Sequence, residues 1–127
     1  MKMSNLLQLN QLKPKIINNV MPIKTTYKFT RLFKEVDENV EFFNKTLSEL
    51  LDNYGQKDEN GQYILTDDGN GVKIKEDKYD ECIAKIDELN ALEANLVYQP
   101  TFKIEELDNI ELSMNELQLL MPFIEEN

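Results

Sequence analysis

A heptad pattern of apolar and aromatic residues is the feature of this sequence that most constrains its fold. From Ile23 onward, these residues recur in alternating steps of four and three: Phe29, Phe33, Val36, Val40, Phe43, Leu47, Leu50 and Tyr54. The pattern predicts one long helix whose apolar stripe packs against a second helix. Pro22 precedes it, where a missing N–H costs little, and Gly55 follows as the expected residue with positive φ. Such a helix spans about 45 Å, so part of it is expected to project or pair.

Turn-forming residues follow the long helix and separate two short runs with strand propensity. The turns are Asp58–Gly61 and Thr66–Gly71, and the runs are Tyr63–Leu65 and Val72–Lys75. This spacing predicts a small β-hairpin over residues 62–75. A disordered loop is the alternative, because a two-stranded hairpin is marginal without packing.

A second helix is predicted after this turn region. Asp77 can cap a helix over residues 78–95, and its apolar stripe comprises Tyr79, Cys82, Ile83, Ile86, Leu89, Leu92 and Leu96. Because the chain returns after a tip at residues 56–76, we expect an antiparallel, coiled-coil-like helical hairpin over residues 23–96.

The two ends of the sequence carry similar patterns. Leu7–Asn10 and Ile110–Ser113 alternate apolar and polar residues, which is typical of short strands, and helical spacing follows each of them. Ser113 and Glu116 match a capping box before the apolar residues 117–121. We therefore expect a short strand from each end to pair beneath the helical hairpin.

Together these elements define the predicted fold class. We predict a mainly helical α+β protein that forms a single domain over residues 1–127. Its centre is the long antiparallel helical hairpin with the small β-hairpin at its tip. The terminal strand and helix elements, at residues 4–21 and 97–127, pack at the base.

Charge is divided unevenly along the chain. The first 34 residues carry seven basic residues and no acidic one, whereas the rest holds all 24 acidic residues and the net charge is −10. This segregation has three readings that the sequence leaves open. The basic start lies against the acidic end of the same chain, meets the acidic part of another copy, or faces a different partner. The negative net charge disfavours direct nucleic-acid binding, even by the basic and aromatic segment from Lys24 to Lys34.

Composition excludes several kinds of catalytic site. The chain has no histidine, which removes the usual serine and cysteine triads, the commonest general base and most zinc sites. The single cysteine, Cys82, lies beside Ile83 at a helical position and is interpreted as a buried thiol. We therefore predict no enzymatic activity and no cofactor. One cysteine and no long apolar run also predict a protein of the cell interior without membrane association.

The loop after the long helix offers the best candidate for a metal site. Its residues match positions 3, 5, 6 and 12 of an EF-hand frame, at Asp58, Asn60, Gly61 and Asp67. Position 1 is Gln56, where calcium binding needs Asp, and position 12 is a short Asp in place of Glu. We therefore interpret these residues as turn formers and predict no metal site. A metal-dependent enzyme is kept as a third alternative.

Several short sequence elements occur together along most of the chain. They are Met21–Lys24 leading into Tyr27–Lys28, the segment from Leu51 to Gly61, the acidic helix over residues 78–95, and the ending Leu119–Ile124. In this combination the chain resembles uncharacterised small proteins encoded by tailed phages and prophages of low-GC Gram-positive bacteria. The resemblance implies a phage-encoded origin and a location in the cytoplasm of the infected host cell or in the virion. It implies no established activity.

The predicted function follows from the long apolar seam. The second helix offers fewer seam contacts than the long helix, so part of the seam is left for a partner. We predict a non-enzymatic protein–protein interaction module, either a virion or assembly component or an accessory factor acting on host machinery. Its partner is a phage structural protein, a host enzyme or a second copy, and the predicted binding residues are Phe33, Val36, Val40, Phe43, Leu47 and Leu50. The alternative is an acidic, DNA-mimic-like inhibitor of a host nucleic-acid enzyme such as a defence nuclease.

Overall fold

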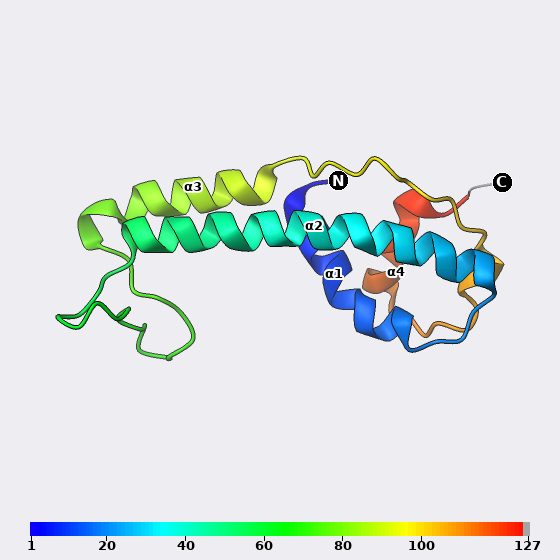
Figure 1. The fold of residues 1–127 in the computed structure, drawn as a ribbon, viewed down its shortest axis with the longest axis horizontal. Coiled ribbons are helices and arrows are strands. Elements are labelled where there is room, and N and C mark those ends of the chain that lie inside the picture. Colours follow the sequence, from blue (N-terminus) through cyan, green and yellow to red (C-terminus); the bar gives the residue numbers. More distant parts are fainter. Residues whose placement is uncertain (126–127) are drawn as a thin grey trace. The chain divides into compact units, whose positions relative to one another are not determined.

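Helices dominate the computed structural model, which describes residues 1–125. Within this range there are four α-helices and no regular β-strand (Figure 1). The α-helices are α1 (Met3–Ile17), α2 (Ile23–Tyr54), α3 (Tyr79–Ala91) and α4 (Met114–Leu120). Three short 3₁₀ turns accompany them, η1 (Glu76–Lys78), η2 (Ile104–Leu107) and η3 (Met121–Phe123). The prediction of a mainly helical protein is confirmed.

The chain forms two compact units that share the long helix. The terminal unit comprises Met1–Val40 and Glu93–Asn127, and the hairpin unit comprises Glu41–Leu92. The long helix α2 therefore supplies its N-terminal part to one core and its C-terminal part to the other. The predicted single domain over residues 1–127 stays a prediction.

The long helix begins and ends where the heptad pattern predicts. It begins at Ile23, directly after Pro22, and its last residue is Tyr54. In the terminal unit its apolar stripe is buried at Phe29, Leu32, Phe33 and Val36. No helix in the described part of the chain is long and apolar enough to cross a membrane.

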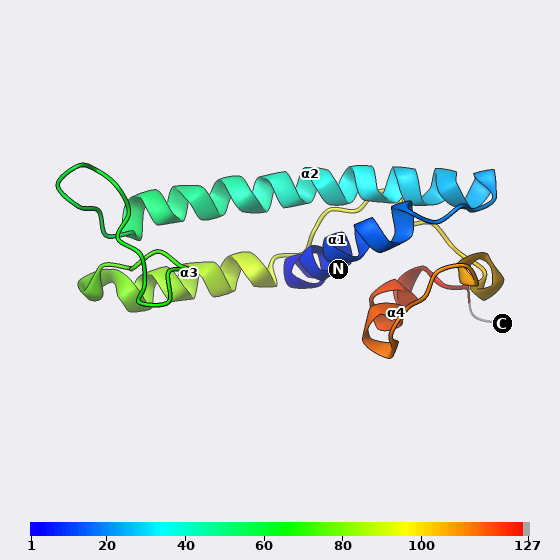
Figure 2. The same ribbon diagram turned by 90° about the horizontal axis from the view of Figure 1, so that it is seen from below.

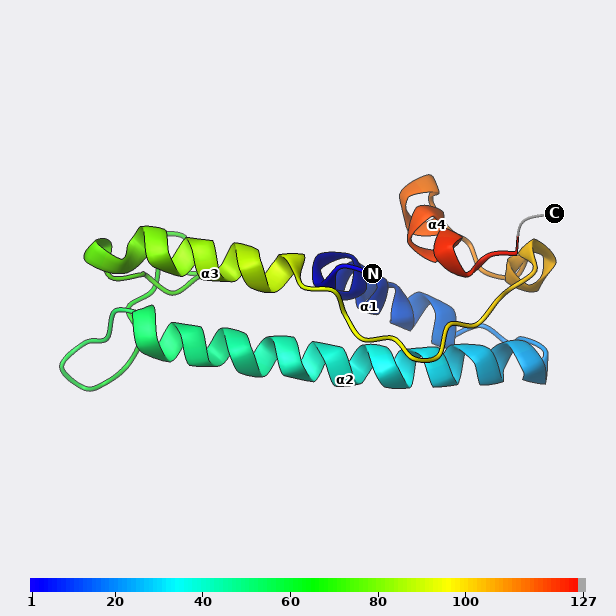
Figure 3. The ribbon, with the colours of Figure 1, turned by 90° about the horizontal axis from the view of Figure 1, so that it is seen from above.

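The first helix, α1, supplies a matching stripe to the core of the terminal unit. Its buried side chains recur every three or four residues, at Met3, Leu6, Leu9, Leu12 and Ile16. The helix lies between the N-terminal part of α2 and α4 (Figures 2 and 3). The extended segment after residue 93 closes the core, since Phe102 stacks on Phe29 with ring centroids 4.3 Å apart. Burial of these facing stripes is the main source of stability in this unit.

The predicted strand at Leu7–Asn10 is wrong, because these residues are helical. The apolar–polar alternation covers only four positions there. The stripe from Met3 to Ile16 continues at helical spacing through the whole of α1 and includes Leu9. The longer periodicity determines the structure because each of its members reaches the same core.

The predicted strand at Ile110–Ser113 is also wrong. Ile110 is buried, but its N–H bonds to the carbonyl of Leu107 in a tight turn, not to a neighbouring strand. Isolated backbone pairs hold the ends of the chain instead. Phe102 pairs in parallel with Ile124, and Lys2 pairs with Glu93 in the antiparallel sense. The strand part of the predicted α+β class is therefore not found in residues 1–125.

The short helix α4 confirms the predicted capping box. The N–H of Glu116 donates to the hydroxyl of Ser113 at 3.2 Å, and the N–H of Ser113 donates to the Glu116 carboxylate at 2.8 Å. These two bonds satisfy backbone groups that the first turn of a helix leaves free.

In the hairpin unit, α3 runs antiparallel to the C-terminal part of α2 (Figures 1 and 3). Cys82 and Leu89 of α3 and Phe43 of α2 are each buried within this unit. The helix ends at Ala91 and not near residue 95. It is shorter than predicted because the chain becomes extended at Leu92, with ψ of 141°.

The tip folds back on itself at the predicted turns but forms no regular hairpin. Leu65 pairs with Val72 across the turn at residues 66–71, as expected. Three backbone segments then bond in a ring: Ile64 donates to Gln56, Gln56 donates to Lys73, and Lys73 donates to Ile64. A regular ladder needs repeated exchange between two strands. The prediction of a β-hairpin is therefore wrong in its strands, although its turns are observed.

Gly55 follows α2 as predicted, but for another reason. Its φ is not positive, whereas Gly61 and Gly69 in the tip do have positive φ. A Cβ at Gly55 would lie 2.5 Å from the carbonyl oxygen of Leu51 and 3.1 Å from the ring of Tyr63. Close approach, and not a left-handed backbone, excludes a side chain at this position.

The stacking of Phe102 predicts a large effect of truncation. Because the side chain is 1% exposed, we expect Phe102→Ala to lower the free energy of unfolding by about 3–5 kcal/mol. Urea unfolding followed by circular dichroism measures the change. Val97→Ala, in the same segment but mostly exposed, is the matched control and should shift stability by less than about 0.5 kcal/mol. Equal effects of the two variants would contradict this packing.

The close approach at Gly55 predicts a second, smaller effect. Gly55→Ala should lower the free energy of unfolding by about 1–3 kcal/mol, because the added methyl group collides with backbone. Gly71→Ala is the control, since a Cβ there meets only ordinary contacts with Thr66. Thermal unfolding of both variants and the wild type compares them. A Gly55→Ala protein as stable as the Gly71→Ala protein would show that the helix end relaxes freely.

Candidate partner-binding site

An open groove lies between α1 and α2 in the terminal unit. Its volume is about 540 Å³, and its lining comes from the end of α1, the connection at residues 18–22 and the first part of α2. We call it the α1–α2 groove, and its defining residues are Ile16, Ile17, Met21, Phe29, Phe33 and Lys34.

The groove has an apolar floor and a mainly basic rim. The floor consists of the buried side chains of Ile16, Phe29 and Phe33. On the rim, Lys13 Nζ lies 2.8 Å from Asp37 Oδ2. Lys34 is exposed, and no acidic side chain within residues 1–125 forms an ion pair with it. The rim therefore keeps a free positive charge beside apolar surface.

The rim is also ordered by an aromatic contact. The guanidinium carbon of Arg31 lies 4.1 Å from the centre of the Tyr98 ring and 5.9 Å from that of Tyr27. A cation over an aromatic face is held there by the charge distribution of the ring. The backbone N–H of Tyr98 also donates to the carboxylate of Glu35 at 2.8 Å, which holds the main chain at Tyr98 beside α2.

Exposed apolar side chains surround the connection between α1 and α2. Ile17, which lines the groove, is 60% exposed, and Val20 and Ile23 are 91% and 85% exposed. Each Å² of apolar surface that is removed from water contributes about 25 cal/mol of favourable free energy. Covering these side chains would therefore favour binding. These side chains form an exposed apolar edge beside the groove.

The six predicted binding residues are divided between the two units. Phe33 and Val36 are buried in the terminal unit, and Phe43 is buried in the hairpin unit. Val40, Leu47 and Leu50 are partly exposed. Of the six, Phe33 alone lines the groove, where it forms part of the floor. The chain's own packing therefore covers half of the predicted seam.

Sequence reasoning missed the residues at the end of α1. Ile16 belongs to the regular α1 stripe, but Ile17 and Val20 fall outside it, and this departure from the stripe was the available signal. The contribution of Lys34 could not be read from the sequence. Its ion pairing depends on which carboxylates the fold brings near.

Two basic residues of the N-terminal segment form ion pairs with acidic residues near the C-terminus of the same chain. This agrees with one of the three interpretations of the charge segregation. Lys15 Nζ lies 2.8 Å from the Glu116 carboxylate, and Lys28 Nζ lies 3.2 Å from that of Glu106. Both pairs lie within the terminal unit. They account for two of the seven basic residues in the first 34, and the Lys13–Asp37 pair accounts for a third.

Glu106 is the best-supported of these carboxylates. Its oxygens accept hydrogen bonds from the buried Thr25 hydroxyl at 2.9 Å, from Lys28, and from the backbone N–H of Lys103 at 2.7 Å. Burial by itself raises the pKa of Glu106, but the Lys103, Thr25 and Lys28 donors together outweigh it and lower the pKa. A carboxylate held by several donors in this way favours its ionised form.

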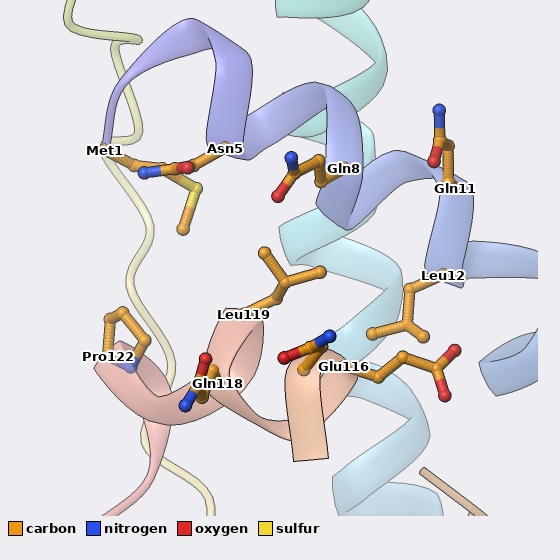
Figure 4. Close-up of a pocket in the computed structure, with 10 residues that line it drawn as sticks. Met1, Asn5, Gln8, Gln11, Leu12, Glu116, Gln118, Leu119 and Pro122 are labelled. Atoms are coloured by element: carbon orange, nitrogen blue, oxygen red, sulfur yellow. The ribbon is translucent and has the colours of Figure 1, made fainter. Parts of the chain in front are cut away.

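A second, polar pocket lies between α1 and α4 and has a volume of about 760 Å³. Figure 4 shows the carboxamides of Asn5 and Gln8 on its α1 side and that of Gln118 on its α4 side. These groups are exposed and neutral, so they offer hydrogen bonds but no acid–base chemistry. The one carboxylate in the lining, Glu116, has its pKa lowered by its hydrogen bond to Lys15 and is already paired.

Of the candidate metal residues of the tip, Asp58 holds its turn in this structure, and in the second turn Asp68, the neighbour of the candidate Asp67, does so. The Asp58 carboxylate accepts the N–H groups of Asn60 and Gln62 at 2.9 and 3.0 Å. In the next turn, the Asp68 carboxylate accepts the hydroxyl of Thr66 and the N–H of Asn70 at 3.1 Å. Such local bonds are the usual role of Asp in a turn. Across residues 1–125, no three acidic or cysteine side chains gather as a metal site.

Cys82 lies in the core of the hairpin unit, as predicted. Its side chain is buried on the inner face of α3, and burial raises the pKa of the thiol. A raised pKa disfavours the thiolate form that acts as a nucleophile.

Comparison with known proteins adds no assignment to these sites. No family model matches the chain, and neither a curated protein nor a solved structure matches it.

The hydrogen bonds to Glu106 predict a pH-dependent contribution to stability. Its pKa is lower in the folded state than its ordinary value of 4.5. The contribution is therefore complete above that value and is lost as pH falls through the folded-state pKa. We expect Glu106→Gln to lower the free energy of unfolding at neutral pH by about 1–3 kcal/mol, and this difference from wild type should shrink in acid.

Urea unfolding at neutral and acidic pH measures the effect. Glu105→Gln removes the same charge from the neighbouring exposed position and is the matched control, with an expected change within about 0.5 kcal/mol. If the Glu106→Gln difference did not depend on pH, the ionised form of Glu106 would not be the one that the fold stabilises.

Proposed function

We propose that this chain is a non-enzymatic protein-interaction module and that it binds a protein through the α1–α2 groove. One observation carries the proposal, the groove itself. It combines an apolar floor, a free basic rim residue at Lys34 and an exposed apolar edge at Ile17. A groove with these properties fits the apolar face of a helix from a partner.

The arrangement of other groups supports binding over catalysis. The polar pocket beside α4 contains neutral amides and a paired carboxylate. Catalysis at neutral pH usually requires a nucleophile or a base in an environment that tunes its pKa. The groove has instead the composition of an interaction surface, in which apolar area supplies affinity and charge supplies orientation.

Two settings follow if the chain is phage-encoded, as its sequence resemblance implies. As a virion or assembly component it binds a phage structural protein, and as an accessory factor it binds host machinery. Both settings lie in the infected cell or in the particle, and both use a protein partner. We propose the groove as the binding surface in either case.

A second candidate function rests on the charge of the hairpin unit. Residues 41–92 hold thirteen acidic and six basic residues, and the ion pairs within this unit involve only Asp52 and Glu81 among the acids. A surface of this kind can compete with nucleic acid for a basic site on an enzyme. This candidate predicts a complex that DNA displaces and that salt weakens steeply.

Affinity capture from phage-infected cells tests the proposed function. The tagged wild-type protein should retain a specific protein that Ile17→Asp fails to retain, because a carboxylate on the groove edge opposes burial. Val97→Asp is the matched control, since Val97 is also mostly exposed but does not line the groove, and it should retain that protein. Titration calorimetry with the purified partner then measures the loss of affinity.

Equal capture by wild type and by a folded Ile17→Asp variant would contradict binding through the groove. If the retained protein were a nucleic-acid enzyme that DNA displaces equally from both variants, the acidic-inhibitor function would be favoured.

A further inference from the structure

The outer face of α3 in the hairpin unit carries an exposed apolar pair with acids beside it. Tyr79 and Ile83 stand one helical turn apart and are 54% and 37% exposed. Asp80 lies three residues before Ile83, and Asp87 lies four residues after it. Residues three and four apart share one face of a helix, so both carboxylates lie beside the apolar pair, on its solvent side. The adjoining face of α3, at Cys82 and Leu89, is already packed in the hairpin unit, so Tyr79 and Ile83 form the exposed border of the helix's apolar stripe.

This face and the α1–α2 groove are complementary in charge. Residues 76–91 hold six acidic and two basic residues. The groove rim carries three basic side chains, Lys13, Arg31 and Lys34, against the single acid Asp37. Opposite charge steers two surfaces together and sets their register, while apolar area supplies most of the affinity.

The two surfaces also match in length. The α2 residues that line the groove run from Thr26 to Asp37, which corresponds to about 16 Å of helix. The stretch from Tyr79 to Asp87 corresponds to about 12 Å. The outer face of α3 can therefore lie within the groove along its whole apolar stretch.

We propose that the α1–α2 groove of one copy binds the outer face of α3 from a second copy of this chain. This inference rests on the proposed function, because it names the occupant of the same groove. Ile83 and Tyr79 pack on the exposed apolar edge of the groove at Ile17, and the acids beside them face the basic rim at Lys34. The complementary helix is part of this chain, so the contact requires no other protein.

Each copy has one groove and one such α3 face. The contact is therefore either exchanged between two copies in a closed dimer or repeated from copy to copy in a chain. Both arrangements use the same pair of surfaces and depend on the same residues.

Complementation between two variants tests the contact. Ile17→Asp damages the groove but leaves the α3 face intact, and Ile83→Asp damages the α3 face but leaves the groove intact. Sedimentation velocity should show self-association of the wild type up to about 1 mM, and each variant alone should associate at least tenfold more weakly. An equimolar mixture of the two variants should associate, because one intact groove then meets one intact α3.

Two further measurements sharpen the test. Lys34→Glu should weaken self-association about tenfold, and the weakening should diminish at high salt. Val97→Asp, at an exposed position outside both surfaces, should associate like the wild type. Circular dichroism confirms that each variant is folded, which is expected because Ile17 and Ile83 are not buried.

A wild-type protein that stays monomeric would overturn the inference, as would folded variants that associate like wild type or a mixture that fails to complement. These failures are distinct from failure of the proposed function. A monomeric wild type that captures another protein in an Ile17-dependent manner overturns the second copy as occupant but keeps the groove as a binding site. A monomeric protein with no Ile17-dependent capture overturns both.

Discussion

The packing of Phe29 is the interaction on which the terminal unit depends. Its ring stacks on Phe102 at 4.3 Å and lies 6.1 Å from Phe33. The contact with Phe102 holds the extended segment against α2. Backbone bonds then follow, since Phe102 donates to Phe123 and accepts from Glu125. Phe29 also forms part of the groove floor, so the core and the candidate binding site share one side chain.

Charge pairing within the terminal unit decides which basic side chains remain available to a partner. Lys15 and Lys28 are held by Glu116 and Glu106, so these bases are committed to the fold. Exposed ion pairs contribute little stability, commonly about 0–1 kcal/mol, but Glu106 gains more because three donors converge on it. Lys34 lies on the groove rim outside these pairs. Within residues 1–125, two of the four bases of the first 34 residues that form no ion pair, Arg31 and Lys34, therefore line the groove together with the exposed side chain of Ile17.

The sequence predicted those elements whose signals are local and long. The heptad pattern located both ends of α2, and the pairing of Ser113 with Glu116 located the start of α4. Predictions that were based on short sequence patterns were wrong. Four alternating residues at Leu7–Asn10 suggested a strand inside what is a continuous helix, and two turns suggested a ladder where three segments bond in a ring. Local alternation is weak evidence because tertiary packing selects among the conformations that it allows.

The sequence by itself determined the helical class, the long helix and the separation of basic from acidic residues, because periodicity and charge are properties of residue order. Only the tertiary structure decided which apolar side chains are covered. Phe33 and Val36 belong to the same heptad seam as Leu47, yet the first two are buried and the last is partly exposed. It also decided that Ile17, outside the seam, is more exposed than Phe33, Val36 and Phe43 within it. Burial depends on what other segments bring to a side chain, and residue order does not specify those neighbours.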